Sequence, residues 1–240
     1  MKIDDKKSFI NTFLVPISRL AESSIINIST NKINSLVSSS DGTILLYAST
    51  SQLNDISSKL NIPDINRLIK VLSCISDNEV DLDVNTNSIE YESVNSGFKY
   101  HLLEDGIIST PTVNLTKLNE LEFDLKFEIE SDVLNSLLKA SAFTTDSDKI
   151  YFYTQPNGIY GQLTDNERHN VDVYTHRICE SFEGSSITTP TPVNFEIIRI
   201  ICGIRFDFLK VSVNTSMNVF VFDLEKDNYT LKFIVSAYVS

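Results

Sequence analysis

The chain has 240 residues, of which 42% are hydrophobic and 10% aromatic, and its 20 Lys and Arg stand against 32 Asp and Glu, for a net charge of −12. This composition is typical of a folded globular protein and excludes an intrinsically disordered one. The charge excludes a protein that coats nucleic acid over its whole surface, although it leaves room for a locally basic face. The length allows two domains of ordinary size.

The N-terminal twenty residues lack the uninterrupted apolar core of a signal peptide, because they carry six charges: Lys2, Asp4, Asp5, Lys6, Lys7 and Arg19. No run elsewhere approaches the roughly 20 apolar residues of a membrane span. The three cysteines, Cys74, Cys179 and Cys202, are odd in number and unpaired in spacing, which suits a reducing compartment. We therefore expect a soluble, intracellular protein without a membrane partner.

A helix is the first predicted element, over residues 4–20. Its apolar residues recur at the spacing of one helix face: Ile10, Phe13, Leu14 and Ile17. Pro16 is expected to kink or end this helix early, because proline has no N–H to donate. Next, β-branched runs at 25–28 and 43–47 lie on either side of an Asp41-Gly42 turn and predict strands joined by a hairpin.

A second helix is predicted over 64–76, after Pro63. One face of this segment is apolar and the other carries Arg67, Lys70 and Cys74. Alternating apolar and polar residues then predict strands in three segments: 80–84, 88–94 and 98–103. We assign residues 1–105 to an N-terminal domain and residues 106–120 to a connector, which lacks periodicity.

The same order restarts in residues 121–240, the predicted C-terminal domain. A strand at 123–129 leads to a helix that starts at Ser131. Strands and a second helix complete it, the helix following Pro192 and the strands lying at 150–155, 159–163, 171–176, 209–213, 219–224 and 229–235.

The two halves repeat one another at a constant offset of 129 positions. The matched residues in the first half are Pro63, Ile69, Lys70, Ile75 and the triplet Val84-Asn85-Thr86; in the second they are Pro192, Ile198, Arg199, Ile204 and Val213-Asn214-Thr215. A repeat of half the chain indicates two similar domains, whereas short repeats of about 20–50 residues build solenoids. The predicted fold class is α+β, with two duplicated domains, each of two helices packed on an antiparallel sheet.

This pattern resembles DNA sliding clamps over the whole chain. The resemblance is carried by the order of helices and strands, the 64–76 helix, and the run Phe98-Lys99-Tyr100-His101-Leu102-Leu103 leading into the connector. It is similar to proliferating cell nuclear antigen and to the T-even phage clamps. Two domains per chain imply a trimeric ring that encircles duplex DNA without reading its sequence, and the compact halves favour a viral or phage source, hence the host cytoplasm.

The resemblance implies that such a ring tethers a DNA polymerase for processivity, is loaded by a clamp loader, and needs no catalytic residue, metal or cofactor. Cations on or beside the four helices would face DNA: Lys6, Lys7, Arg19, Arg67, Lys70, Lys139, Arg199 and Arg205. Lys70 and Arg199 occupy equivalent positions in the repeat, and of these cations they are the pair most expected to contact DNA. Glu196 departs from this pattern, because it places an acid on a helix that would face phosphate.

The resemblance also implies two protein-binding surfaces. A pocket beneath the connector would take a hydrophobic segment of a partner and is assigned to Ile44, Leu46, Ile107, Ile108, Val113, Tyr238 and Val239. Subunits would join edge strand to edge strand through Phe98, Tyr100 and Leu102 of one chain and Ile159, Gly161 and Leu163 of the next.

Two alternatives stay open at this point. An enzyme finds little support, because the chain has only three histidines and no glycine-rich phosphate loop or nucleophile elbow. His169, Asp172, His176 and Cys179 could be imagined as zinc ligands, but their spacing matches no familiar site. The other alternative is a clamp-like scaffold that does not encircle DNA, which the acidic charge would suit.

Overall fold

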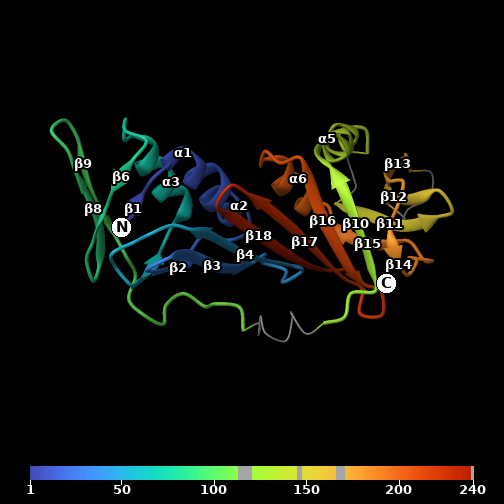
Figure 1. The fold of residues 1–240 in the computed structure, drawn as a ribbon, viewed down its shortest axis with the longest axis horizontal. Helices are drawn as coiled ribbons and strands as arrows, with labels where there is room; N and C mark the ends of the chain where they lie inside the picture. Colours follow the sequence, from blue (N-terminus) through green and yellow to red (C-terminus); the bar gives the residue numbers. More distant parts are fainter. Residues whose placement is uncertain (113–120, 145–147, 166–170, 239–240) are drawn as a thin grey trace. The chain divides into compact units, whose positions relative to one another are not determined.

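The computed structural model describes residues 1–112, 121–144, 148–165 and 171–238. The chain forms two compact units (Figure 1). The first unit comprises Met1–Ser40, Leu45–Thr112 and Lys226–Leu231, and the second comprises Asp41–Ile44, Val113–Glu225 and Lys232–Ser240. The predicted strand at 43–47 therefore contributes to both units, and so does the last strand of the chain.

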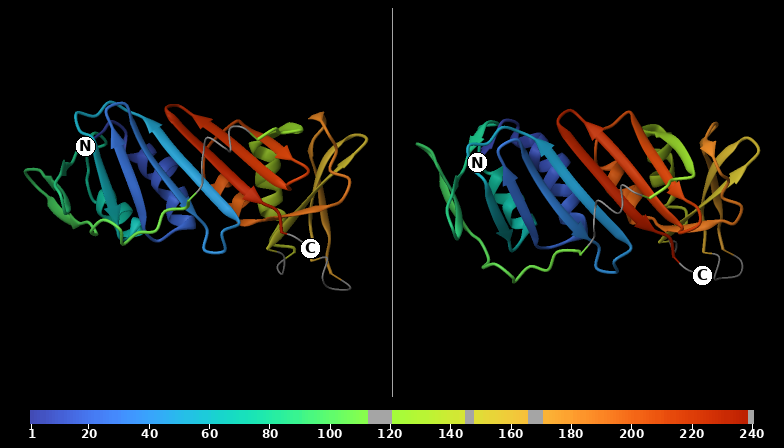
Figure 2. Two further views of the ribbon diagram at one scale, coloured as in Figure 1. Left: turned by 90° about the horizontal axis from the view of Figure 1, so that it is seen from below. Right: turned by 60° about the horizontal axis from the view of Figure 1, so that its bottom comes forward.

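The first unit combines helices with three antiparallel sheets. Its elements are β1 (Lys2–Ile3), α1 (Lys6–Ser8), the π-helix η1 (Phe9–Leu14), α2 (Val15–Leu20), β2 (Ser24–Ser29), β3 (Lys32–Ser38), β4 (Ile44–Ser51), β5 (Ser58–Ile62), α3 (Ile65–Ser73), β6 (Val80–Asp81), β7 (Asp83–Val84), β8 (Ser88–Glu92) and β9 (Gly97–His101). Four strands form the main sheet in the order β4-β3-β2-β5, β7-β8-β9 form a second sheet, and β1 pairs with β6. The helices lie on one face of the main sheet (Figures 1 and 2).

The predicted first helix is present, but it does not end at Pro16. Asp5 caps its start by accepting a hydrogen bond from the Ser8 N–H at 3.0 Å. The middle of the helix has the wider π-helical turn, and the chain then continues as α2 to Leu20 with Pro16 in its first turn. Pro16 therefore lies within a continuous helix, directly after the π-helical turn, whose i→i−5 bond from the Val15 N–H to the Ile10 carbonyl shifts the hydrogen-bond register next to the missing N–H.

Helix α3 shows how the amphipathic pattern becomes packing. Asp64 caps it by accepting from the Arg67 N–H at 2.9 Å, and its apolar face is buried at Ile65, Leu68 and Leu72. The helix starts one residue later and ends three residues earlier than predicted. The polar face, with Arg67 and Lys70, stays exposed.

The second unit repeats the combination of helices and antiparallel sheets. Its elements are β10 (Leu125–Glu130), α5 (Ser131–Ala140), β11 (Lys149–Gln155), β12 (Gly158–Leu163), β13 (Tyr174–Cys179), β14 (Glu183–Gly184), β15 (Thr191–Asn194), α6 (Glu196–Cys202), β16 (Phe208–Asn214), β17 (Val219–Lys226) and β18 (Tyr229–Ser236). The strand order is β14-β10-β16-β17-β18 in one sheet and β13-β12-β11-β15 in the other.

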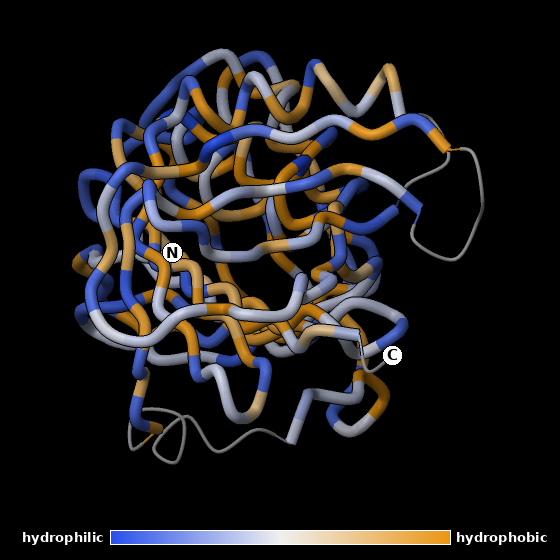
Figure 3. The backbone as a smooth tube through the Cα atoms, turned by 90° about the vertical axis from the view of Figure 1, so that its right-hand side faces the viewer, coloured by the Kyte–Doolittle hydropathy of each residue, from blue (hydrophilic) through white to orange (hydrophobic). Residues whose placement is uncertain are grey.

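Strict alternation along β10 separates the core from solvent. Leu125, Phe127 and Ile129 are buried, whereas the residues between them are exposed. Similar alternation of hydrophobic and hydrophilic residues is visible along the strands in Figure 3. Phe152 of β11 and Phe220 of β17, both fully buried, meet with ring centroids 5.4 Å apart, so the two sheets share one core.

Some predicted boundaries in this unit are wrong. Pro192 does not open a helix, because it lies in β15 and pairs with Tyr151 of β11, and α6 begins only at Glu196. The strand expected at 171–176 is observed at 174–179. Strands β1, β3, β5, β14 and β15 are not among the strands predicted from the sequence. The Asp41-Gly42 turn joins β3 to β4, so the predicted hairpin between 25–28 and 43–47 is wrong.

Candidate functional site

Exposed cations gather on the helices of each unit. In the first unit, Lys7 lies on α1, Arg19 on α2, and Arg67 and Lys70 on α3, and all four side chains are exposed. The helices α2 and α3 pack against one another, so their exposed faces belong to one helical layer.

The second unit presents three further cations from its own helical layer. Lys139 is exposed near the end of α5, Arg199 is exposed on α6, and Arg205 is exposed three residues after α6 ends. Here too the two helices, α5 and α6, pack against one another. The repeat-equivalent residues Lys70 and Arg199 are thus both accessible from solvent.

The prediction that the eighth cation, Lys6, faces DNA is wrong. Its side chain is only 8% exposed, and its ammonium donates a hydrogen bond to the carbonyl oxygen of Ile75, just beyond α3. The backbone N–H of Lys6 also donates to the carbonyl of Asn78 at 2.8 Å. Lys6 therefore ties the first helix to the segment after α3, because a buried ammonium must be satisfied by such acceptors.

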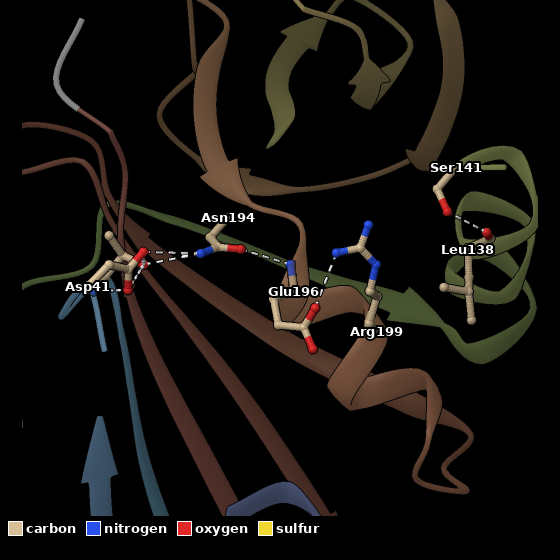
Figure 4. Close-up of polar contacts among 7 residues, drawn as sticks. Asp41, Leu138, Ser141, Asn194, Glu196 and Arg199 are labelled. Atoms are coloured by element: carbon tan, nitrogen blue, oxygen red, sulfur yellow. Dashed lines mark hydrogen bonds and ion pairs between the residues drawn. The ribbon is translucent and has the colours of Figure 1, made fainter. Parts of the chain in front are cut away.

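The start of α6 is organised by a short polar network (Figure 4). The amide oxygen of Asn194 accepts from the Glu196 N–H at 2.9 Å, and its amide nitrogen donates to Thr43 Oγ1 at 3.3 Å and to Asp41 Oδ2 at 3.4 Å. One turn later, Arg199 Nη1 donates to Glu196 Oε2 at 3.1 Å. Glu196, the acid that departs from the expected row of cations, thus forms an ion pair with Arg199.

Arg199 has a second contact that restricts its side chain. Its guanidinium carbon lies 5.0 Å from the centroid of the Phe195 ring, within the range of a cation–π interaction. The Arg199 side chain is still 42% exposed. Arg199 is therefore held near α6 by Phe195 and Glu196, and it keeps N–H groups available to a ligand.

A groove of about 400 Å³ lies in the first unit, beneath the last described residues of the first half of the chain. Its walls come from the segment after α2, from β2 and β3, and from the segment after Ile107. They comprise Ala21, Ser23, Ser24, Ile25, Leu36, Val37, Ser38, Ile108, Ser109, Thr110, Pro111 and Thr112. Ile108 lines the groove, as predicted for the partner pocket. Ile107 is not among the lining residues, but its side chain is 58% exposed directly beside them.

Other residues assigned to this pocket lie elsewhere. Ile44 and Leu46 are fully buried and cannot line a surface, because their side chains point into the hydrophobic core. Tyr238 belongs to the second unit, where its N–H donates to the Pro192 carbonyl at 3.0 Å and Lys149 Nζ lies 5.2 Å from its ring centroid. Burial raises the pKa of the Tyr238 hydroxyl. Val113 and Val239 lie outside the described residues.

Strand β9 provides a free sheet edge in the first unit. Within the described part of the chain it pairs with β8 only. The N–H of Leu102 donates to Asn87 O at 2.8 Å, and this register directs the backbone groups of Phe98, Tyr100 and Leu102 towards β8. The free edge is consequently formed by the backbone groups of the intervening residues, Gly97, Lys99 and His101.

The predicted interface residues of β9 have mixed environments. Tyr100 is only 4% exposed, and its hydroxyl donates to the Asp64 carbonyl at 2.6 Å and accepts from the Asp64 N–H at 3.2 Å. It therefore anchors the edge strand to the cap of α3. Phe98 and Leu102 are half-buried, and Phe98 stacks on Tyr91 with centroids 6.0 Å apart.

The second predicted interface strand is wrong. Ile159, Gly161 and Leu163 lie in β12, which pairs with β11 on one side and β13 on the other and so has no free edge. A Cβ at Gly161 would lie 2.9 Å from Ile178 Cδ1 and 3.0 Å from Ile150 Cδ1, which explains the glycine by packing. The two edges of this sheet are β13 and β15, because among the described residues β13 pairs with β12 alone and β15 with β11 alone.

The described residues hold no group of three or more His, Cys, Asp or Glu side chains placed to bind a metal ion. His169, one of the imagined zinc ligands, lies outside them. On β13, the ring of His176 stacks on Tyr174, whose hydroxyl lies 3.2 Å from Nδ1 of His176. No helix in the described ranges is long and apolar enough to cross a membrane.

No model of a known protein family matches the sequence, and no curated protein matches it either. The structure, however, is similar over its whole length to solved structures of PCNA. One is A. fulgidus PCNA with the bound C-terminal region of FEN-1, with a TM-score of 0.77 and 15% identity, covering 100% of this chain and 98% of that one.

Two further structures agree with the first. PCNA from Entamoeba histolytica has a TM-score of 0.74 and 16% identity, covering 99% of this chain and 98% of that one. The PCNA2–PCNA3 complex from Sulfolobus tokodaii has a TM-score of 0.72 and 13% identity, with 98% of each chain covered. These similarities confirm the predicted fold class: the chain has the PCNA clamp fold, in which helices pack on antiparallel sheets in two duplicated domains.

Proposed function

We propose that the chain is a sliding clamp, three copies of which form a ring around duplex DNA and hold a DNA polymerase on its template. The full-length similarity to PCNA structures carries this proposal. It is supported by the seven exposed cations on or beside the helices of both units. Phosphate contacts of this kind position a protein on DNA without reading sequence, so the ring would slide.

The function is topological and requires no catalytic group. With a net charge of −12, the chain repels DNA at long range except near its helical faces. Enclosure would supply the retention that weak contacts do not, and a clamp loader would be needed to open the ring. We place the protein inside the cell, with a viral or phage origin favoured by its compact halves.

The edges of β9 and β13 are the proposed subunit contacts, in place of β9 and β12. Among the described residues each strand has one unpaired side, and pairing them between copies would satisfy both rows of backbone groups. A head-to-tail contact between two different edges generates a ring when the rotation closes. The domain assignment of 1–105 and 121–240 around a connector at 106–120 is retained as part of this proposal.

The groove bordered by Ile107 and Ile108 is the proposed docking site for the polymerase and the loader. The volume of about 400 Å³ suits a few side chains of a partner segment. One of the similar structures holds the C-terminal region of another protein, which supports this kind of docking. A partner segment docked there would also bury the exposed side chain of Ile107.

The decisive experiment measures mass and topology together. Light scattering should give three times the chain mass, and protein retained on a nicked circular plasmid should be lost when the plasmid is cut once. The double variant Lys70→Glu, Arg199→Glu should lose retention on the circle while remaining trimeric. A control with the same charge change on strands, Lys32→Glu with Lys226→Glu, should behave like the native chain.

Two outcomes would contradict the proposal. A monomeric mass at micromolar concentration would exclude the ring. A trimer retained equally on circular and linear plasmid would instead favour a clamp-shaped scaffold that does not enclose DNA, the alternative that the acidic charge supports.

A further inference from the structure

The hairpin between β8 and β9 ends in an exposed apolar knob. Val94 lies at its tip and is 100% exposed. The turn is held by the Ser93 N–H, which donates to Ser96 O at 2.8 Å, and by the Ser96 N–H, which donates to Ser93 Oγ at 3.2 Å. The valine is thus presented on a closed turn, and little conformational entropy would be lost when it is buried.

A groove of about 980 Å³ in the second unit is lined in part by the last residues of β13, Arg177, Ile178 and Cys179. Its walls are formed by β10, the start of α5, the segment from β13 to β14, and β16 with β17. Apolar side chains are among its lining residues: Val133, Phe182 and Phe208. Phe208 is 58% exposed, an unusual position for so large an apolar side chain.

The lengths of the two edge strands restrict how they could pair. β9 has five residues and β13 has six, and both belong to wholly antiparallel sheets. Antiparallel pairing outnumbers parallel pairing two- to three-fold, and it continues the pattern of both sheets. Only two antiparallel registers keep all five residues of β9 within β13: those that place Gly97 opposite Cys179 or opposite Ile178.

Both registers lead to the same neighbourhood for the hairpin tip. The strand direction of β9 extends back only to Ser96, where the turn begins, and Ser96 falls opposite Glu180 in the first register and opposite Cys179 in the second. Both residues line the groove. The turn that carries Val94 therefore lies beside the groove on the next copy whichever register is adopted.

We propose that Val94 of each copy inserts into the groove of the neighbouring copy, against Phe182 and Phe208, and locks the β9–β13 contact. This inference rests on the proposed ring and identifies what fastens it. The tip residues, Ser93 to Ser96, carry no charge, so they approach a neighbour without the repulsion that a net charge of −12 per chain would otherwise impose.

The insertion gives the subunit contact a side-chain component that backbone pairing lacks. Edge strands pair with any other exposed edge, whereas a knob and a matching groove select one partner. The groove also carries charges of both signs around its apolar residues, among them Arg177, Glu180 and Lys210. These would surround the buried contact as a polar rim, the usual organisation of a specific interface.

The test is a site-specific cross-link to a native cysteine. Cys179 lines the groove and is half-buried, and burial raises the pKa of its thiol, so the reaction is run above neutral pH. In a background with Cys74→Ser and Cys202→Ala, Val94→Cys should be joined to Cys179 of the neighbour by a short bismaleimide. A denaturing gel should then show covalent dimers and trimers.

Two matched variants make the outcome specific. Leu53→Cys, on another exposed apolar residue that is 76% exposed, should give no ladder, and Val94→Cys combined with Cys179→Ser should lose it. Independently, Val94→Asp should raise the trimer dissociation concentration by roughly tenfold or more, since burying a valine is worth about 1.5 kcal/mol or more. Val94→Ile should leave the trimer intact.

The result that would overturn the inference is a trimeric mass without the cross-link, or with the same ladder from Leu53→Cys. That outcome would leave the ring standing and remove the insertion. A monomeric mass for the native chain would contradict the ring and this inference together, so the two failures are distinguishable by light scattering alone.

Discussion

Glu196→Gln should tighten the hold of the proposed ring on DNA. In the native chain the Glu196 carboxylate lies 3.1 Å from Arg199 Nη1, and the side chains are 31% and 42% exposed. An ion pair of this exposure is worth about 0.2–1 kcal/mol. DNA phosphates must compete with it, so neutralising Glu196 releases the guanidinium for phosphate while Phe195 still holds it near α6.

A ring of three copies adds up the gain in binding free energy from each Arg199. Three copies give about 0.6–3 kcal/mol in total, which corresponds to roughly 3- to 150-fold slower release from a circular plasmid. Each additional phosphate contact adds about 0.9 to the slope of log affinity against log salt, so the slope should steepen by up to about 2.7. The assay follows release from nicked circular plasmid across a salt series.

Stability serves as the internal check for this variant. Glu196 lies in the first turn of α6, where a negative charge contributes about 0.3–1 kcal/mol, so the variant should unfold at slightly lower denaturant. The matched control is Glu225→Gln, an exposed acid on β17 that removes the same charge away from the helices. An unchanged salt slope for Glu196→Gln, or an equal change for Glu225→Gln, would refute the idea that Glu196 restrains Arg199.

Two further predictions concern stability. Tyr100→Phe removes both hydrogen bonds between the phenol and the Asp64 backbone, so it should lower the free energy of unfolding by about 1–3 kcal/mol. The control Tyr91→Phe should change that free energy by less than about 0.5 kcal/mol. Equal losses for the two variants in urea titrations would contradict this prediction. Burial raises the pKa of Cys202 to about 11, so the folded chain binds that proton more tightly than the unfolded chain, and the free energy of unfolding should fall as pH rises from about 9 to 11. Cys202→Ala should reduce that fall relative to a Cys74→Ala control.

Helix faces are the feature that local sequence predicted best. The apolar spacing in α3 determines which side packs, and this leaves Arg67 and Lys70 on the exposed side. The constant offset of 129 positions then transfers the same argument to Arg199 on α6. Both inferences succeed because helical periodicity is a property of neighbouring residues.

Local sequence pattern does not predict which individual residues are buried. Lys6 lies in a charged segment of the sequence, yet its side chain is buried and its ammonium donates a hydrogen bond to a carbonyl oxygen 69 positions away. Ile44 and Leu46 looked like surface candidates for a pocket and are fully buried. Each outcome depends on what packs over the residue, which local pattern does not encode.

The amino-acid sequence by itself determined the duplication, the α+β class and the amphipathic faces, since these follow from periodicity and from a repeat read along the chain. Only the tertiary structure decided which strands are edges. β12 and β13 are both six-residue strands, and nothing local shows that, within the described part of the chain, β12 has partners on both sides while β13 has one. Strand pairing joins segments distant in sequence, so the free edges that would close a ring are a property of the folded sheet.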